Sequence, residues 1–301
     1  VVRGEAEDVM VASVLGLPPD CIRVFCPAMN TTMWKQDSVQ RNVAELEAQG
    51  WIRIGPGAGL LACKAEGEGR MAEPADIVRE LAAGMKSAQS LRGRQVLILS
   101  GPTREHIDPV RFISNPSTGM MGRALAQEAL SRGAQVDFIS GPVDPAVLPR
   151  GRNIRIHSVT SAQEMLAAAK KHFSSADIIL FAAAVADYAP AGAHTRKMPK
   201  QQDRIQLELE PTPDIAATLC RTKTGKQTAV GFALQDEDGE EKAREKLQGK
   251  NLDAIVLNRL EAVGSSDAVY KFLKAGDSSF EEWDLMTKRG CARRIFEKIL
   301  Q

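Results

Sequence analysis

The chain has 301 residues, and its 39 lysine plus arginine residues against 38 aspartate plus glutamate residues give a net charge of +1, which argues against a general nucleic-acid-binding surface. The length favours two domains of about 100–200 residues each. The five cysteines are scattered and form no C-x-x-C pair, and no apolar run approaches the roughly 18 residues of a membrane helix. We therefore expect a cytoplasmic enzyme without membrane contact.

The first region predicts short strands and helices before a junction. Strands are expected at 22–26 and 51–54, and helices at 40–49 and 74–85. The glycine-rich segment 55–59 breaks this pattern.

Residues 86–93 have no strong periodicity, so the domain junction is placed there, between a domain at 1–88 and one at 93–301. Because the chain opens on Val1 rather than on methionine and at once reads as helix, we expect a fragment of a longer protein.

From residue 95 onward strands and helices alternate regularly. The expected strands are 95–100, 135–140, 177–182, 228–232 and 254–257. The expected helices are 121–132, 162–172, 214–220, 240–248 and 288–300. This alternation is typical of an α/β, Rossmann-like, mostly parallel sheet with helices on both faces. Segments 269–273 and 281–285 predict a late antiparallel addition.

Segment 101–119 is expected to be a loop between a buried strand and a helix. Ser117 and Gly119 fall where the helix begins, and there unpaired N–H groups and the positive end of the helix dipole are open to an anion. Spacing alone leaves an ordinary helix cap equally open. Neither the G-x-G-x-x-G fingerprint nor a Walker loop is present, which argues against a nicotinamide-dependent reductase.

This segment, Gly-Pro-Thr-Arg-Glu-His-Ile-Asp-Pro-Val-Arg-Phe-Ile-Ser-Asn-Pro-Ser-Thr-Gly, resembles the nucleotide loop of phosphopantothenate–cysteine ligases. Such ligases occur in bifunctional coenzyme A biosynthesis flavoproteins that also carry phosphopantothenoylcysteine decarboxylase. The resemblance extends over essentially the whole chain. It implies that 93–301 is the ligase domain and that 1–88 is the C-terminal part of a flavodoxin-like flavoprotein domain.

The resemblance also implies the ligase chemistry. Nucleotide activates 4′-phosphopantothenate to an acyl-nucleotide, and the amine of cysteine then displaces the nucleotide. CTP and Mg²⁺ are implied, although residues alone do not distinguish CTP from ATP, and the metal ligands stay unassigned. Asn115 would hydrogen-bond the acyl intermediate, and Lys197 would stabilise the developing charge. The implied nucleotide-binding residues are Gly101, Ser117, Gly119, Asp187, Lys197, Pro213, Asp214, Ile215, Ala216, Phe232, Lys246 and Lys250.

Each of these positions also has a structural alternative. Asp187 could cap a loop, Phe232 could belong to the core, and Asn115 could be a turn residue before a proline. Lys246 and Lys250, at i, i+4, share one side of a predicted helix, where two lysines are ordinarily just solvated.

Four positions depart from the family pattern, namely Met120, Pro199, Thr212 and Gln235. Met120 stands where the family often has lysine, so the anion pocket has lost one cation. These departures leave open a non-catalytic regulatory or partner subunit derived from the family.

The first domain carries motifs of the decarboxylase. Pro-Ala-Met-Asn, ending at Asn30, resembles the family's substrate-carboxylate motif, and 61–71 resembles its substrate clamp, in which Cys63 would be the acid. The family's FMN site and base histidine lie in a preceding portion. All four histidines of this chain fall in 93–301, so we expect no decarboxylase activity from this chain alone. The resemblance also implies a homo-oligomer with a ligase dimer.

Overall fold

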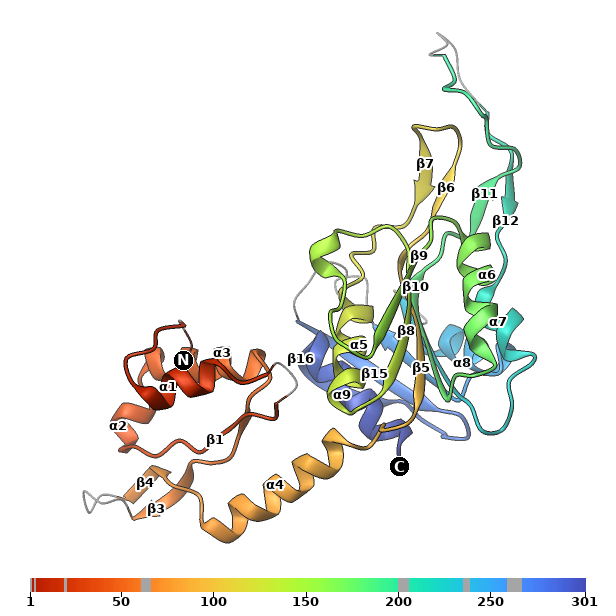
Figure 1. Ribbon diagram of the computed structural model, residues 1–301. Helices are drawn as coiled ribbons and strands as arrows, with labels where there is room; N and C mark the ends of the chain where they lie inside the picture. The colour runs from red at the N-terminus through yellow and green to blue at the C-terminus, as the bar shows by residue number, and fades with distance from the viewer. Residues whose placement is uncertain are drawn as a thin grey trace. The chain divides into compact units, whose positions relative to one another are not determined.

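The computed structural model describes residues 2, 4–18, 21–60, 66–199, 206–234, 239–258 and 267–301. The chain forms two compact units, Val1–Ala88 and Gln89–Gln301. The first unit is coloured red to orange in Figure 1, and the second runs from yellow-orange to blue. Within the described ranges, no helix is long and apolar enough to cross a membrane.

The first unit contains a parallel strand pair with a helical crossover. β1 (Val24–Phe25) pairs with β2 (Ile52–Arg53), and α2 (Thr31–Trp34) and α3 (Asp37–Ala48) lie between them in sequence. Parallel strands require such a crossover. The predicted strand–helix–strand order is confirmed, although both strands are shorter than predicted. α1 (Val9–Leu15) precedes this pair, and α4 (Pro74–Ala88) ends the unit.

An antiparallel hairpin lies where the sequence predicted only a break at 55–59. It consists of β3 (Gly57–Leu60) and β4 (Glu66–Arg70). Glycines hid these strands, because glycine has low strand propensity. Close packing explains one of them: a Cβ added at Gly69 would lie 2.1 Å from the Met29 carbonyl oxygen.

The second unit is built on a sheet of eight described strands in the order β16-β15-β14-β13-β10-β5-β8-β9. The parallel strands are β5 (Gln95–Pro102), β8 (Gln135–Ser140), β9 (Ile154–Ser158), β10 (Ile178–Ala184), β13 (Thr228–Leu234) and β14 (Ala254–Asn258). The chain adds β8 and β9 to one side of β5 and then adds β10, β13 and β14 to the other side. This is the Rossmann strand order. The predicted fold class is confirmed.

The C-terminal strands form the predicted antiparallel addition. β15 (Asp267–Lys274) pairs antiparallel with β14 and with β16 (Glu281–Thr287). Trp283 and Tyr270 are among the largest fully buried side chains, so this addition extends the core rather than merely covering an edge.

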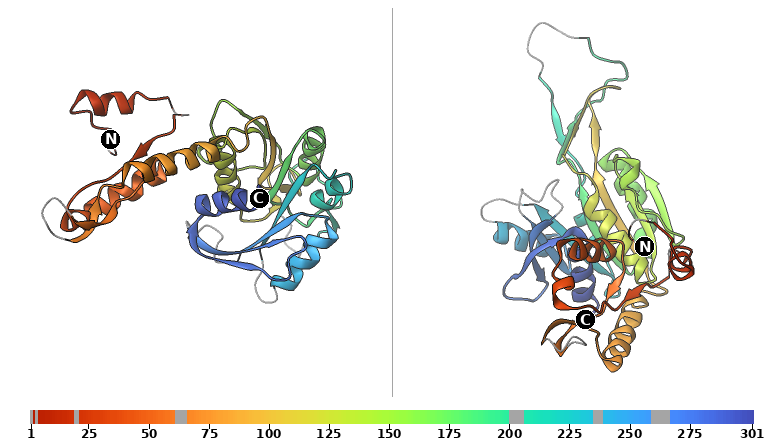
Figure 2. Two further views of the ribbon diagram at one scale, coloured as in Figure 1. Left: turned by 90° about the horizontal axis from the view of Figure 1, so that it is seen from below. Right: turned by 90° about the vertical axis from the view of Figure 1, so that its left-hand side faces the viewer.

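Helices cover both faces of the sheet (Figures 1 and 2). α5 (Met120–Ser131) and α9 (Lys288–Ile299) contribute to one core cluster, and α6 (Ala162–Phe173), α7 (Ile215–Cys220) and α8 (Gly239–Gly249) contribute to the other. On β5, Val96 and Ile98 belong to the first cluster, whereas Leu97 and Leu99 belong to the second. Burial on both faces explains the continuous apolar run of this strand.

Two short antiparallel hairpins project from the sheet, as Figure 1 shows. One pairs β6 (Arg104–His106) with β7 (Phe112–Ser114), and the other pairs β11 (Tyr188–Pro190) with β12 (Leu209–Pro211). The prediction of a single loop over 101–119 is therefore wrong. Three-residue strands are too short to show a period, and β9 was missed because its alternation extends over only five residues.

Candidate functional site

The predicted loop residues converge at the point where the strand order reverses. β5 and β10 are neighbours in the sheet, but the chain continues from them toward opposite sides. The Asn115 amide nitrogen, after β7, donates to the carbonyl oxygens of Val185 at 3.0 Å and Ala184 at 3.4 Å, after β10. Ligands of open α/β sheets bind at such a switch point. Asn115 thus joins the two loops that border it.

Two glycines form the floor of the first loop. Gly101, the penultimate residue of β5, has φ 78°, and Gly119, which caps α5, has φ 75°, a left-handed conformation that favours glycine. A Cβ on either would lie 3.0 Å from the Val143 side chain. Ser117 Oγ accepts a 3.4 Å hydrogen bond from the Gly119 N–H. Backbone conformation and close packing therefore explain why both predicted positions are glycine. The N-terminus of α5 follows Gly119.

The start of α5 packs tightly onto β5. A Cβ added at Gly122 would lie 2.0 Å from Ser100 Oγ. Met120, where the family often has lysine, is 41% exposed. An uncharged methionine side chain therefore lies at the surface of the helix start, in place of the family's lysine. α5 begins one residue before the predicted 121.

Thr103 is an organising residue that the sequence reasoning missed. It is fully buried, and its Oγ1 accepts from the Ala186 N–H at 3.0 Å. Thr212 Oγ1 donates to the Ala186 carbonyl at 2.5 Å, and the Thr212 N–H donates to the Asp187 carbonyl at 2.9 Å. Thr212, one of the departures from the family, thus helps to hold the loop that presents the exposed Asp187.

Asp214 caps α7 and pairs with a lysine. Its Oδ1 accepts from the Ala217 N–H at 3.0 Å, and its Oδ2 lies 2.9 Å from Lys250 Nζ. The helix consequently begins at Ile215, one residue after the predicted start. Burial raises the pKa of Asp214, but the Ala217 N–H and the charges of Lys250 and Lys246 outweigh it and leave the pKa below its ordinary value.

Lys246 belongs to the same electrostatic cluster. Burial lowers its pKa, and Lys250 lowers it further, while Asp187 and Asp214 act in the opposite direction. Within the described part of the chain, Lys250 is ion-paired and Lys246 is not. The structure thus brings together four predicted residues from the loop after β10, the start of α7 and the end of α8, and among the described residues Lys246 has no ion-pair partner.

The other predicted residues near α7 are more buried. Ile215 is 4% exposed and lies in the core, and Pro213 and Ala216 are half-buried. Phe232 is half-buried and packs against the core cluster on the α5 side. The alternative that Phe232 is a core residue is therefore partly correct, because the residue is half-buried against the core.

Lys197 lies on the segment between β11 and β12 and is exposed. Its neighbour Met198 is docked on the β6–β7 turn: the Met198 N–H donates to Asp108 Oδ2 at 3.2 Å, and Arg111 donates to the Met198 carbonyl at 2.5 Å. The sequence reasoning missed Asp108 and Arg111, and the Asp-Pro turn was the available signal. Among the described residues, no ion pair or hydrogen bond joins Lys197 to the Asp214–Lys250 pair.

Asp108 is buried and strongly hydrogen-bonded. Burial raises its pKa, but the N–H groups of Val110, Arg111 and Met198 and the Arg111 charge lower it below the ordinary value overall. An ionised Asp108 therefore ties the lysine segment to the hairpin.

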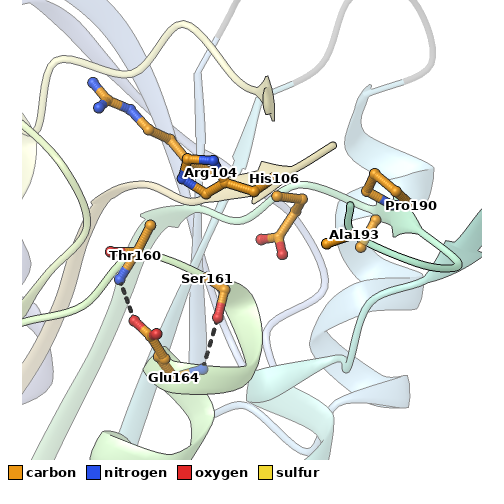
Figure 3. Close-up of a pocket in the computed structure, with 9 residues that line it drawn as sticks. Arg104, His106, Thr160, Ser161, Glu164, Pro190 and Ala193 are labelled. Atoms are coloured by element: carbon orange, nitrogen blue, oxygen red, sulfur yellow. Dashed lines mark hydrogen bonds between the residues drawn. The ribbon is translucent and has the colours of Figure 1, made fainter. Parts of the chain in front are cut away.

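A separate pocket of about 280 Å³ lies between β6, β11 and the start of α6 (Figure 3). The helix amides there have protein acceptors: Glu164 accepts from the Thr160 N–H at 2.7 Å, Ser161 Oγ from the Glu164 N–H at 3.2 Å, and Glu105 from the Ala162 N–H at 2.9 Å. Typical ligand pockets occupy about 300–1,000 Å³. This small, carboxylate-lined pocket is unsuited to a triphosphate.

In the first unit, the Asn30 motif and the clamp hairpin pack together. Asn30 is an exposed residue, and its Oδ1 caps α2 by accepting from the Met33 N–H at 2.8 Å. Thr31 Oγ1 donates to the Glu68 carbonyl at 2.8 Å, and the Met29 N–H donates to the Gly69 carbonyl at 2.9 Å. Cys63, between β3 and β4, lies outside the described residues, as does Gln235.

Comparison with known proteins decides the family. Residues 91–301 match the DNA/pantothenate metabolism flavoprotein C-terminal domain, and residues 17–86 match the flavoprotein family. The coenzyme A biosynthesis bifunctional protein CoaBC of Bacillus subtilis is 39% identical over 304 residues, which cover 99% of this chain and 73% of that protein. The chain belongs to the CoaBC family.

Other relatives also match most of this chain. A cysteine/cysteine sulfinic acid decarboxylase from an unknown prokaryotic organism is 39% identical over 304 residues, covering 99% of this chain and 84% of that protein. The crystal structure of a CoaBC C-terminal domain is 38% identical, with a TM-score of 0.60, and covers 70% of this chain and 96% of that one. Both domain types of the CoaBC family are thus present in this chain.

Proposed function

We propose that residues 89–301 catalyse the nucleotide-dependent joining of 4′-phosphopantothenate to cysteine in coenzyme A biosynthesis. The observation that carries this proposal is the meeting of Asn115 with the Asp187 loop at the switch point, beside the cluster of Asp214, Lys246 and Lys250. Sequence kinship with CoaBC supports the same reaction.

The nucleotide is proposed to lie across the switch point. The N-terminus of α5 at Gly119 offers backbone N–H groups to phosphate. Lys246 supplies positive charge to the triphosphate as a point charge, because its ammonium is not ion-paired within the described residues. The half-buried Ala216 and Phe232 are proposed to border the base and ribose, and Ile215 supports them from the core.

Two substitutions occur in the proposed chemistry. A carboxylate oxygen of 4′-phosphopantothenate attacks the α-phosphorus, and pyrophosphate leaves. The cysteine amine then attacks the acyl carbon, the nucleoside monophosphate leaves, and the amine proton passes to solvent. Asn115 holds the acyl group through its amide, and Lys197 neutralises charge that develops on the acyl phosphate. CTP is the proposed nucleotide.

Mg²⁺ fits the donor set of this region. Magnesium is usually held by one or two carboxylates together with substrate phosphates, and the exposed Asp187 offers one carboxylate beside Lys246. When bound, the ion would neutralise charge on the triphosphate. Asp214 is less suited, because its free oxygen already pairs with Lys250.

The first unit is proposed to belong to a flavin-dependent decarboxylase of phosphopantothenoylcysteine. The Asn30 Oδ1 caps α2, and among the described residues the structure gives its NH₂ group no hydrogen-bond partner, so this group is proposed to bind the substrate carboxylate. β4 packs on the same motif, and Cys63, which precedes β4 in the sequence, is proposed as the acid that protonates the intermediate. FMN, when bound, would supply the redox chemistry.

A dimer of the ligase unit is proposed to form through the projecting hairpins. They expose apolar side chains that a monomer would leave in water, namely Val110, Phe112, Tyr188, Leu207 and Leu209. A second copy of the same hairpins would bury them, and sedimentation of the Val110→Glu, Phe112→Glu variant against the unaltered chain tests this association.

The assay that tests the ligase proposal mixes the chain with 4′-phosphopantothenate, cysteine, Mg²⁺ and either CTP or ATP. We expect phosphopantothenoylcysteine and pyrophosphate in equal amounts, with CTP preferred. Absence of both products with either nucleotide would support the alternative of a non-catalytic partner subunit, which Met120, Pro199 and Thr212 leave open.

A further inference from the structure

A second cluster of chemically active side chains lies outside the site described above. It consists of Asp137 on β8, His157 on β9 and His172 in the last turn of α6. β8 and β9 are paired at one edge of the sheet, and α6 packs on β8 and β5. None of the three side chains follows β5 or β10, where the proposed nucleotide residues lie.

The three ligand atoms converge on one point. His157 Nε2 lies 3.0 Å and His172 Nδ1 lies 3.5 Å from Asp137 Oδ1. One donor atom from each residue lies within 4.8 Å of the others, and the imidazole centroids are 4.4 Å apart. The Asp137 side chain is 6% exposed, whereas those of His157 and His172 are 29% and 23% exposed. The cluster is therefore anchored in the fold and open to solvent on its histidine side.

This donor set suits a zinc-like ion. Zn²⁺ binds imidazole nitrogen and carboxylate oxygen at about 2.0–2.2 Å, so ligand atoms of a tetrahedral site lie roughly 3.3–3.6 Å apart. The two contacts to Asp137 differ from that spacing by a few tenths of an ångström at most. His172 also stands at the C-terminus of α6, where the helix dipole favours positive charge.

One competitor occupies the carboxylate. Arg155 Nε and Nη2 donate to Asp137 Oδ1 and Oδ2 at 3.0 and 3.1 Å. The Arg155 side chain is 66% exposed, so it can turn into solvent without disturbing the core. A cation arriving at the histidines would replace the guanidinium as the partner of the buried carboxylate.

We propose that Asp137, His157 and His172 form a binding site for Zn²⁺ or a similar divalent transition metal, with water completing the coordination. The ion would join the edge strand β9 and the end of α6 to β8. Its role is structural or regulatory and independent of the proposed ligase chemistry.

The test uses the whole chain after treatment with a chelator. Zn²⁺ is titrated by calorimetry, and Co²⁺ serves as the spectroscopic probe. We expect binding at one equivalent, with d–d bands of a nitrogen and oxygen site, and an upward shift of the melting temperature with Zn²⁺. His157→Gln and His172→Gln should each weaken binding by at least about tenfold, the lower end of what even outer partners of metal ligands cost.

Two variants sharpen the result. Arg155→Gln should bind Zn²⁺ at least as tightly as the unaltered chain, because the competing guanidinium is gone, whereas a merely structural ion pair predicts no gain. His194→Gln, which removes an exposed histidine elsewhere in the same unit, should bind normally. If His157→Gln does not fold, His172→Gln tests the site instead, because it changes a residue in the last turn of a helix rather than one in a strand of the sheet.

Equal binding by the unaltered chain, His157→Gln and His172→Gln would overturn the site. Thiolate-to-Co²⁺ charge-transfer bands at that equivalent would also overturn it, because they would place the ion on cysteine. Ligase turnover is measured separately, so loss of either function leaves the other testable.

Discussion

The Asn115 side chain donates a 3.0 Å hydrogen bond to the Val185 carbonyl, and this bond links the loop after β7 to the loop after β10. The two loops border the switch point of the sheet, where α/β folds bind ligands. Asn115 is also an exposed residue, so a side chain that makes this positioning contact remains accessible at the switch point.

Asn115→Ala should impair the reaction far more than folding. Loss of one preorganised donor in an acyl-transfer site costs about 10²–10³ in kcat. Loss of one ordinary hydrogen bond costs about 0.5–1.5 kcal/mol of stability. Pyrophosphate release and urea unfolding measure the two effects, and Asn153→Ala, at an exposed asparagine away from the site, is the control. A near-normal kcat in Asn115→Ala would remove this residue from the mechanism.

Substitution of Lys246 in α8 and of Lys250 just after it should change the KM for nucleotide to different extents. Lys246→Gln should raise the KM for nucleotide by roughly tenfold or more, because Lys246 is not ion-paired within the described residues. Lys250→Gln should have a smaller effect, because Lys250 already neutralises Asp214. Lys242→Gln, an exposed lysine on the same helix, should leave KM unchanged. Equal KM values for all three variants would contradict triphosphate binding here.

Asp214 should give stability a defined pH dependence. Its pKa is lower in the folded chain, so its charge stabilises the fold fully above the unfolded pKa of about 3.9 and loses this effect as pH falls through the folded value. Asp214→Asn keeps a good helix cap but loses the charge. The difference in unfolding free energy between the two proteins should be constant from about pH 5 to 7 and shrink below about pH 4.

Asp214→Ala separates the cap from the charge. It should cost about 0.5–2 kcal/mol relative to Asp214→Asn, because alanine cannot accept the Ala217 N–H. Urea titrations at several pH values provide both comparisons. If the difference in unfolding free energy between the unaltered chain and Asp214→Asn grew below pH 4, the pKa of Asp214 would not be lowered in the folded chain.

Gly122→Ala should displace α5 from β5. The added Cβ would lie 2.0 Å from Ser100 Oγ, and overpacking of this kind costs about 1–3 kcal/mol. Because α5 carries the proposed phosphate-binding terminus, the KM for nucleotide should rise as well. Gly225→Ala, where an added Cβ meets nothing within 4 Å, should be close to neutral in both measurements.

The sequence predicted the parallel sheet because its strands are long and buried on both faces. Val96 to Leu99 feed two opposite core clusters, and such runs are readable without a structure. The β6–β7 hairpin was not predicted because its three-residue strands are too short to show a period, and the β3–β4 hairpin was not predicted because its glycines lower strand propensity. Tertiary contacts, rather than local preference, form them.

The site was only partly predictable for a related reason. Asn115, Asp187 and the lysine pair were named from motifs, and the structure brings three separate chain segments together around them. Thr103, Asp108 and Arg111 were missed because their side chains bond to backbone groups of segments far along the chain, and the Asp-Pro turn was the one local signal for Asp108 and Arg111. The pairing of Asp214 with Lys250 likewise depends on how α7 and α8 pack.

Transfer of oxygen tests the proposed acyl-nucleotide most directly. 4′-Phosphopantothenate labelled with ¹⁸O in its carboxylate is incubated with the chain, cysteine, Mg²⁺ and CTP, and the nucleotide product is analysed by mass spectrometry. We predict one ¹⁸O atom in each released CMP, because the carboxylate oxygen bonds to the α-phosphorus and stays there when cysteine attacks. Amide formation with unlabelled CMP, or no turnover, would contradict the account.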